Sequence, residues 1–161
     1  MYKRQVFGFA TSQGLEASRA TYFASFTIMN MLVGYILGIA CIPKIIQQET
    51  ALKLSAIAGI IFALIALFTT GLFSVVFISL LGLGNSLIWP SIWPLAIDGL
   101  GRFTKTGSSL LIMAVGGGAI LPLLYGRLAE DYNPQAAYWI VIPCYLFILY
   151  YAAMGNKIRT R

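Results

Sequence analysis

The sequence predicts an all-α integral membrane protein with five transmembrane helices. Of its 161 residues, 59% are apolar and only 10% are charged, whereas soluble domains have roughly 45–50% and 25%. The eleven basic and five acidic residues are also spread unevenly, so that long stretches of the chain carry no charge at all. Stretches of this kind have the length and composition that a membrane-spanning helix requires.

Four uncharged segments define the helices. They run from Ala20 to Pro43, Leu54 to Ile97, Thr106 to Gly126 and Tyr132 to Asn156. About 20 apolar residues cross the ~30 Å hydrocarbon core, so the second segment is long enough for two helices, which Thr69, Thr70 and Gly71 separate by a turn. The expected helices are Thr21–Ile42, Ala51–Phe68, Leu72–Ile97, Ser108–Leu124 and Gln135–Met154.

Residues 1–20 are expected to form a lead-in outside the membrane. The short apolar run around Val6 and Phe9 is followed at once by polar residues, so it is too short for the core of a signal peptide. Residues 1–5 look like the translated remnant of an adapter and receive no functional role here.

Basic residues predict the orientation of the chain. One side of the expected bundle carries four of them, namely Lys3, Arg4, Arg19 and Arg127, and the other side carries seven, namely Lys44, Lys53, Arg102, Lys105, Lys157, Arg159 and Arg161. Because basic residues are retained on the cytoplasmic side, the C-terminus is expected to be cytoplasmic. The same bias explains the net charge of +6 without nucleic-acid binding.

The third expected helix carries the strongest sign of function. Asn85, Ser86 and Trp89 lie within one membrane crossing, together with Pro90 and Pro94. At about 100° per residue, Asn85 and Trp89 fall near one face of a helix, and prolines in a membrane are tolerated where the backbone faces protein or water. A polar, kinked helix with indole rings suits a sugar; the alternative is that Asn85 bonds a neighbouring helix and the tryptophans anchor the interface.

Two other expected helices carry polar or flexible positions. Asn30 lies near the middle of the first helix, where its amide either contacts substrate or bonds another helix. Gly34 and Gly38 form a GxxxG pair that indicates close helix packing. In the fourth helix the kink candidates are Gly117, Gly118 and Pro122, and packing is the favoured explanation for most glycines there.

The residue inventory disfavours an enzyme. The chain has no histidine, and Cys41 and Cys144 lie far apart among apolar neighbours, so no metal, cofactor or catalytic set is expected. All five carboxylates lie outside the expected helices, so the acid that a proton-coupled transporter requires inside the membrane is missing from this chain.

Two neighbouring motifs resemble the fucose/glucose/galactose permeases, which are sugar:proton symporters of the major facilitator superfamily. The motifs are NSLIWPSIWPLAIDGLG from Asn85 to Gly101 and GSSLLIMAVGGGAILPLLYGRLAED from Gly107 to Asp131. The resemblance implies that the chain corresponds to helices eight to twelve of such a permease, a partial C-terminal transporter domain in the inner membrane. It also implies a monosaccharide substrate, a coupling proton and, as a partner, the N-terminal half that carries the coupling acids.

One other class of function remains open from the residues alone. A small membrane scaffold or subunit acts only through helix contacts, and its sequence can be equally apolar. Such a protein does not require the kinked helix that carries Asn85, Trp89 and two prolines.

Overall fold

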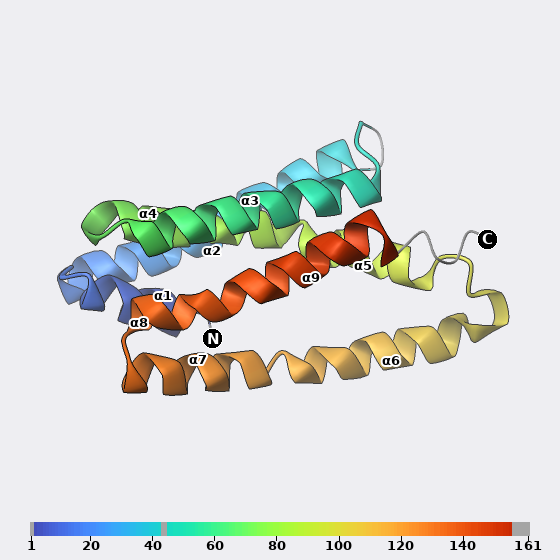
Figure 1. The fold of residues 1–161 in the computed structure, drawn as a ribbon. Helices are drawn as coiled ribbons and strands as arrows, with labels where there is room; N and C mark the ends of the chain where they lie inside the picture. Colours follow the sequence, from blue (N-terminus) through green and yellow to red (C-terminus); the bar gives the residue numbers. More distant parts are fainter. Residues whose placement is uncertain (1, 43–44, 156–161) are drawn as a thin grey trace.

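The computed structural model describes residues 2–42 and 45–155, which form helices joined by short loops, with no strand among them (Figure 1). The elements are α1 (Tyr2–Ser12), α2 (Ala17–Cys41), α3 (Gln48–Phe68), α4 (Gly71–Ser86), α5 (Ile88–Ile97), η1 (Gly101–Phe103), α6 (Thr104–Gly117), α7 (Ile120–Asp131), α8 (Pro134–Ala137), η2 (Tyr138–Ile140) and α9 (Val141–Ala153).

Five helical segments, some made of two or more consecutive helices, are long and apolar enough to cross a membrane, which confirms the predicted fold class. They are Ala17–Cys41, Gln48–Phe68, Gly71–Ile97, Gly101–Asp131 and Pro134–Ala153. The first and fourth extend beyond the expected limits because charged residues continue the helical backbone past the apolar segment. Arg19 lies in the first turn of α2, and Glu130 and Asp131 end α7.

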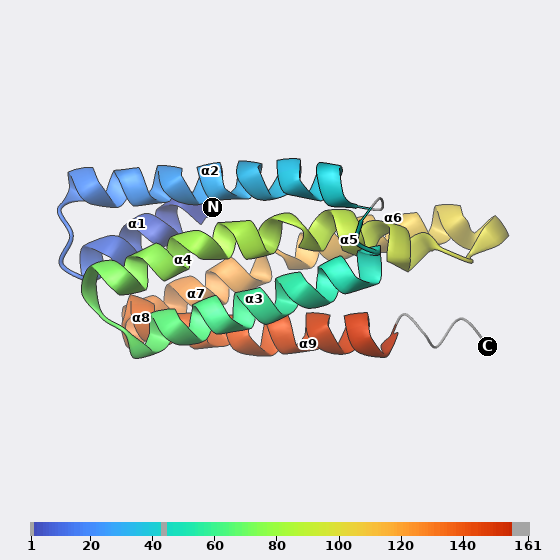
Figure 2. The ribbon, with the colours of Figure 1, turned by 90° about the horizontal axis from the view of Figure 1, so that it is seen from above.

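The helices run roughly alongside one another and place alternate loops at opposite ends of the bundle (Figures 1 and 2). The α1–α2, α3–α4 and α7–α8 connections share one end, whereas the α5–α6 connection and the end of α9 lie at the other. This arrangement agrees with the loop alternation on which the predicted orientation rests. Lys44 and the basic tail with Lys157 lie outside the described residues.

Side-chain size, and not polarity, separates the inside of the bundle from its outside. Ala20, Ala24 and Ala63 are almost completely buried, whereas Ile39 and Phe147 are more than 70% exposed. Small residues let membrane helices approach closely, while large apolar side chains face lipid. The pattern is therefore that of a bundle immersed in hydrocarbon.

Glycines of α2 and α4 form the tightest helix contact. A Cβ on Gly34 would collide with the Ser86 side chain, and a Cβ on Gly38 would collide with Leu87. The predicted packing role of this GxxxG pair is thereby confirmed. On the opposite helix, a Cβ on Gly82 would meet Thr27 of α2 at 3.0 Å from its Cγ2 and closer still to its carbonyl oxygen.

The N-terminal lead-in differs from the expectation, because Tyr2–Ser12 form a helix that packs into the bundle. Val6, Phe9 and Ala10 are fully buried, and their spacing of three and four residues places them on one side of α1. The ring of Phe9 meets that of Tyr138 edge-on at 5.2 Å. A segment with three buried apolar side chains lies beside the membrane helices, not apart from them.

Two glutamines, Gln13 and Gln135, join three connections at the α1–α2 end of the bundle. The Gln135 Nε2 lies 2.8 Å from the Thr69 oxygen, 2.9 Å from the Leu67 oxygen and 3.1 Å from the Ala66 oxygen. Its Oε1 accepts a hydrogen bond from Gln13 Nε2, and Gln13 Oε1 accepts one from the Gly71 N–H at 2.8 Å. The carbonyls left without partners at the end of α3 are therefore satisfied by a side chain.

Candidate functional site

A cavity of about 340 Å³ lies between α4, α7 and α9, with one residue of α1 at its edge. Its volume falls within the range of about 300–1,000 Å³ that is usual for small-molecule sites. Most of its wall is apolar, and the side chains in it that can donate or accept hydrogen bonds include Gln5, Asn85, Tyr125, Tyr138 and Tyr145. Among the side chains that the structure describes, none that lines it is charged.

Asn85 and Tyr145 form the polar pair of this cavity. The hydroxyl of Tyr145 in α9 donates a hydrogen bond of 2.6 Å to Oδ1 of Asn85 near the end of α4. Tyr145 is only 3% exposed, and its ring packs against the backbone of α3 at Gly59. An apolar cavity with a few fixed polar groups is the usual composition of a ligand site.

Two aromatic rings close the end of the cavity nearer the α7–α8 connection. Tyr125 and Tyr138 meet edge-on with ring centroids 5.1 Å apart, and both are buried. The hydroxyl of Tyr125 reaches the carbonyl oxygen of Pro134 at 3.5 Å. Because the Phe9 ring also packs edge-on with Tyr138, α1 supports this wall of the cavity.

Asn85 and Trp89 line two different hollows, and the regular helix is interrupted between them. The last residue of α4 is Ser86, and α5 begins at Ile88. Pro90 has no N–H to bond the Ser86 carbonyl, so the regular helix cannot continue through this turn. Asn85 and Trp89 therefore lie on either side of this interruption.

Trp89 instead lies with Trp93 in a second hollow, of about 640 Å³, between α5 and α6. The two indole rings are 5.5 Å apart, and Pro90, Pro94 and Ile112 complete the lining. Trp89 is 46% exposed. The indole pair is therefore separate from the cavity beside Asn85.

Asn30 and Ser86 occupy helix contacts and do not line the cavity. Asn30 is buried, and its Nδ2 donates to the Ser79 carbonyl oxygen of α4 at 3.3 Å. Ser86 is fully buried against Gly34, and its hydroxyl donates to the Leu83 oxygen at 2.6 Å. For both residues the structure favours bonding within the helix bundle over direct contact with a ligand.

The fourth membrane segment is interrupted beside the same cavity. The helix α6 ends at Gly117, and α7 begins at Ile120. Gly118 and Pro122 line the cavity. The sequence favoured packing as the reason for these glycines, but among the described residues a Cβ on Gly116 or Gly117 would meet nothing within 4 Å.

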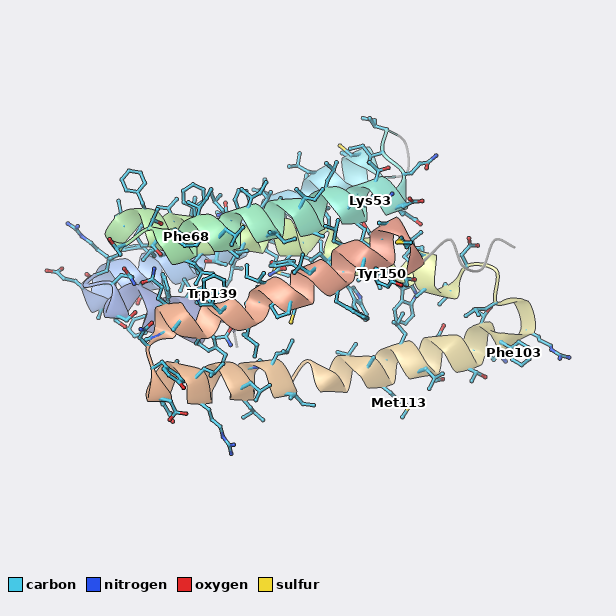
Figure 3. All side chains as sticks on the ribbon, in the orientation of Figure 1. Lys53, Phe68, Phe103, Met113, Trp139 and Tyr150 are labelled. Carbon is cyan, nitrogen blue, oxygen red and sulfur yellow. The ribbon has the colours of Figure 1, made fainter. Side chains whose placement is uncertain are left out.

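The segment from Gly101 to Asp131 is also the most exposed of the five. Its most apolar stretch of 18 residues contains no buried residue. Met113 projects from α6 with 72% of its surface exposed (Figure 3). Phe103 in η1, at the start of this segment, is exposed as well. The two interrupted segments, α4–α5 and α6–α7, thus border one cavity but differ strongly in how firmly they are packed.

Acidic residues stay at the ends of the membrane segments. Glu49 lies in the first turn of α3 and pairs with Lys53, and Asp98 follows the last residue of α5. Among the described residues, no group of three His, Cys, Asp or Glu side chains could hold a metal ion. The polar side chains named above as lining the cavity are amides and phenols, which can exchange hydrogen bonds with hydroxyl groups.

Several residues of the site are missing from the prediction, among them Tyr125 and Tyr138 in the cavity wall. Gln5 belongs to the five residues that received no functional role, yet it lines the cavity. Tyr145 and Gly59 lie in apolar helices in which nothing in the local sequence marks them. The role of Tyr145 is visible only in the tertiary structure, because its hydrogen-bond partner Asn85 is 60 residues away in the sequence.

Comparison with known proteins gives relatives of one kind. A glucose/galactose transporter of Brucella abortus is 35% identical over 147 residues, which cover 91% of this chain and 35% of the transporter. A putative glucose/galactose transporter of Helicobacter pylori is 29% identical over 157 residues, covering 94% and 38%. The L-fucose-proton symporter of Escherichia coli is 26% identical over 148 residues, covering 91% and 34%. No family model matches the chain.

The fold comparison agrees with these relatives. The crystal structure of the major facilitator superfamily transporter FucP in the outward conformation superposes with a TM-score of 0.77 and 22% identity, covering 99% of this chain and 41% of FucP. A second FucP structure gives a TM-score of 0.78. The fold is therefore that of the major facilitator superfamily, and the resemblance predicted from the two motifs is confirmed. The chain spans about a third of the length of the relatives it matches.

Proposed function

We propose that this chain, a homologue of the glucose/galactose transporters and fucose symporters of the major facilitator superfamily, supplies part of the pathway by which a secondary transporter carries a monosaccharide. The observation that carries this proposal is the Asn85–Tyr145 pair in the wall of an otherwise apolar cavity. Asn85 is the fifteenth of the 27 residues in its membrane segment, so the pair lies midway across the bundle. Midway is where transporters of this architecture bind their substrates.

The chemistry of the cavity supports a sugar of the fucose, glucose or galactose class. A sugar offers hydroxyls to an amide, and its C–H face packs against aromatic rings such as those of Tyr125 and Tyr138. The described side chains that line the cavity are uncharged, which favours a sugar over an ion or a charged metabolite. In this proposal Asn85 contacts the sugar, whereas Asn30 and Ser86 hold α2 against α4. Trp89 lies along the route of the sugar through the transporter and not at the binding site.

The two interrupted helices support movement at the site. Pro90 and Pro94 follow the break in one membrane segment, and Gly117, Gly118 and Pro122 surround the break in the other. Broken helices beside a central cavity are a common feature of secondary transporters. We assign these five residues to the bending of the α4–α5 and α6–α7 segments as the cavity opens to one side of the membrane and then to the other. A scaffold protein does not require such bending.

Proton coupling is assigned to another part of the transporter. The carboxylates of this chain lie at helix ends, and a coupling acid has to exchange its proton within the membrane. The proposed partner is therefore the N-terminal part that the relatives possess beyond the matched region. We further propose that the protein resides in the inner membrane with a cytoplasmic C-terminus. The 161-residue chain alone is not expected to concentrate sugar.

Uptake measurements test the proposal. The chain is joined to the N-terminal part of the Brucella glucose/galactose transporter that it does not cover, and labelled glucose and galactose are measured in vesicles with a proton gradient. Loss of one hydrogen bond of about 0.5–1.5 kcal/mol in Asn85→Ala should weaken apparent affinity about 2- to 13-fold at matched expression. Asn30→Ala is the control, because it should lower stability and leave affinity unchanged. Unchanged affinity in Asn85→Ala would refute the site.

A further inference from the structure

Tyr145 of α9 and Gly59 of α3 form a close contact that insertion into a membrane does not require. Tyr145 carries a hydroxyl into a nearly water-free position, with 3% of its surface exposed. A buried tyrosine hydroxyl requires a hydrogen-bond partner. The partner here is the amide oxygen of Asn85, at 2.6 Å.

The position of the Tyr145 ring depends on the missing side chain of Gly59. A Cβ built on Gly59 would lie 2.5 Å from Cζ and 2.9 Å from Cδ1 of the ring, distances that real Cβ atoms essentially never show. The ring therefore lies directly on the backbone of α3. Because the hydroxyl is attached to Cζ, any displacement of the ring also displaces the hydrogen bond to Asn85.

We infer that Tyr145, seated on Gly59, is a positioning residue that orients the Asn85 amide toward the sugar. This inference rests on the proposed function, because it assumes that Asn85 contacts the substrate. An amide held by a buried hydroxyl keeps one rotamer before the substrate arrives, and a preorganised group binds without first being ordered. Three helices, α3, α9 and α4, thereby set the orientation of one side chain.

A purely structural role for Tyr145 makes different predictions. If the hydroxyl only ties α9 to α4, its removal lowers stability and leaves substrate affinity unchanged at matched expression. If it orients Asn85, its removal raises the apparent KM, leaves the maximal rate unchanged and has no effect once Asn85 is gone. The two roles are separated by the apparent KM at matched expression and by a double-mutant cycle with Asn85→Ala.

The first experiment observes the amide directly in the 161-residue chain. The chain has four asparagines, so selective ¹⁵N labelling in lipid nanodiscs yields four side-chain NH₂ signals, and Asn85→Ala identifies one of them. Tyr145→Phe and Gly59→Ala should both shift the Asn85 signal and leave the Asn30 signal in place. Tyr125→Phe is the matched control, since Tyr125 lines the same cavity and bonds Pro134. An Asn85 signal that Tyr145→Phe leaves unmoved would overturn the inference.

The second experiment uses the uptake assay and distinguishes the inference from the proposed function. Tyr145→Phe should raise the apparent KM for galactose by about 2- to 5-fold, in the range of one lost neutral hydrogen bond, and should change nothing further in the Asn85→Ala background. If Asn85→Ala weakens affinity and Tyr145→Phe has no effect, or multiplies the Asn85→Ala effect, the inference fails while the proposed site stands. If Asn85→Ala itself leaves affinity unchanged, the proposed site fails.

Discussion

Replacing Gly82 with alanine measures how closely α2 and α4 are packed. The new Cβ would lie 3.0 Å from Cγ2 and 3.3 Å from the carbonyl carbon of Thr27, and closer than either to the carbonyl oxygen. Ordinary contact begins at 3.4 Å, so the helices must separate by more than 0.4 Å at this point (3.4 − 3.0). The same separation loosens the neighbouring contacts at Gly34 and Gly38.

The size of the effect follows from two opposing contributions. Overpacking a close-packed site costs about 1–3 kcal/mol, whereas exchanging glycine for alanine within a helix favours folding by about 1 kcal/mol or less. We expect the free energy of unfolding of Gly82→Ala to fall by about 1–2 kcal/mol. Gly116→Ala is the matched control, because a Cβ there meets nothing within 4 Å and should leave stability equal or slightly higher.

Equilibrium unfolding of the purified chain in mixed micelles measures these differences. Thr27→Ser adds a second test, since it removes Cγ2 but leaves the carbonyl oxygen, and should therefore rescue Gly82→Ala only in part. Equal stability of Gly82→Ala and Gly116→Ala would refute the close approach of α2 and α4. Complete rescue by Thr27→Ser would show that the methyl group, and not the backbone, is the obstacle.

Two further predictions concern the ends of the bundle. Gln135→Ala should lower the free energy of unfolding by about 1–3 kcal/mol, because it leaves carbonyls at the end of α3 without their donor; Gln47→Ala, at an exposed position, should have little effect in the same unfolding assay. For the orientation, single cysteines replacing Lys105 and Tyr132, in a chain without Cys41 and Cys144, should react with an impermeant maleimide from the cytoplasmic and periplasmic sides respectively. Labelling of position 105 from the periplasm would reverse the topology.

The number and approximate position of the membrane helices could be predicted from the sequence. Lipid offers no hydrogen-bond partners, so every uncharged stretch of sufficient length has to be helical, and charged residues mark the ends. The location of the breaks was also readable, because Pro90 and the glycines before Ile120 act on their own backbone. These properties are local, and a local cause leaves its mark within a few residues.

Only the tertiary structure decided which side chains meet. In a helix of a soluble protein, polarity distinguishes the inner face from the outer face. Here both the lipid and the bundle interior are apolar, so the remaining difference is side-chain size: many alanines and glycines face inward, whereas many isoleucines face outward. The sequence also placed Asn85 and Trp89 at one site, whereas the structure has them lining two different hollows on either side of the interruption at Leu87. The pairs Asn85–Tyr145 and Gln13–Gln135 join residues 60 and 122 positions apart, and their partners are set by how the helices pack.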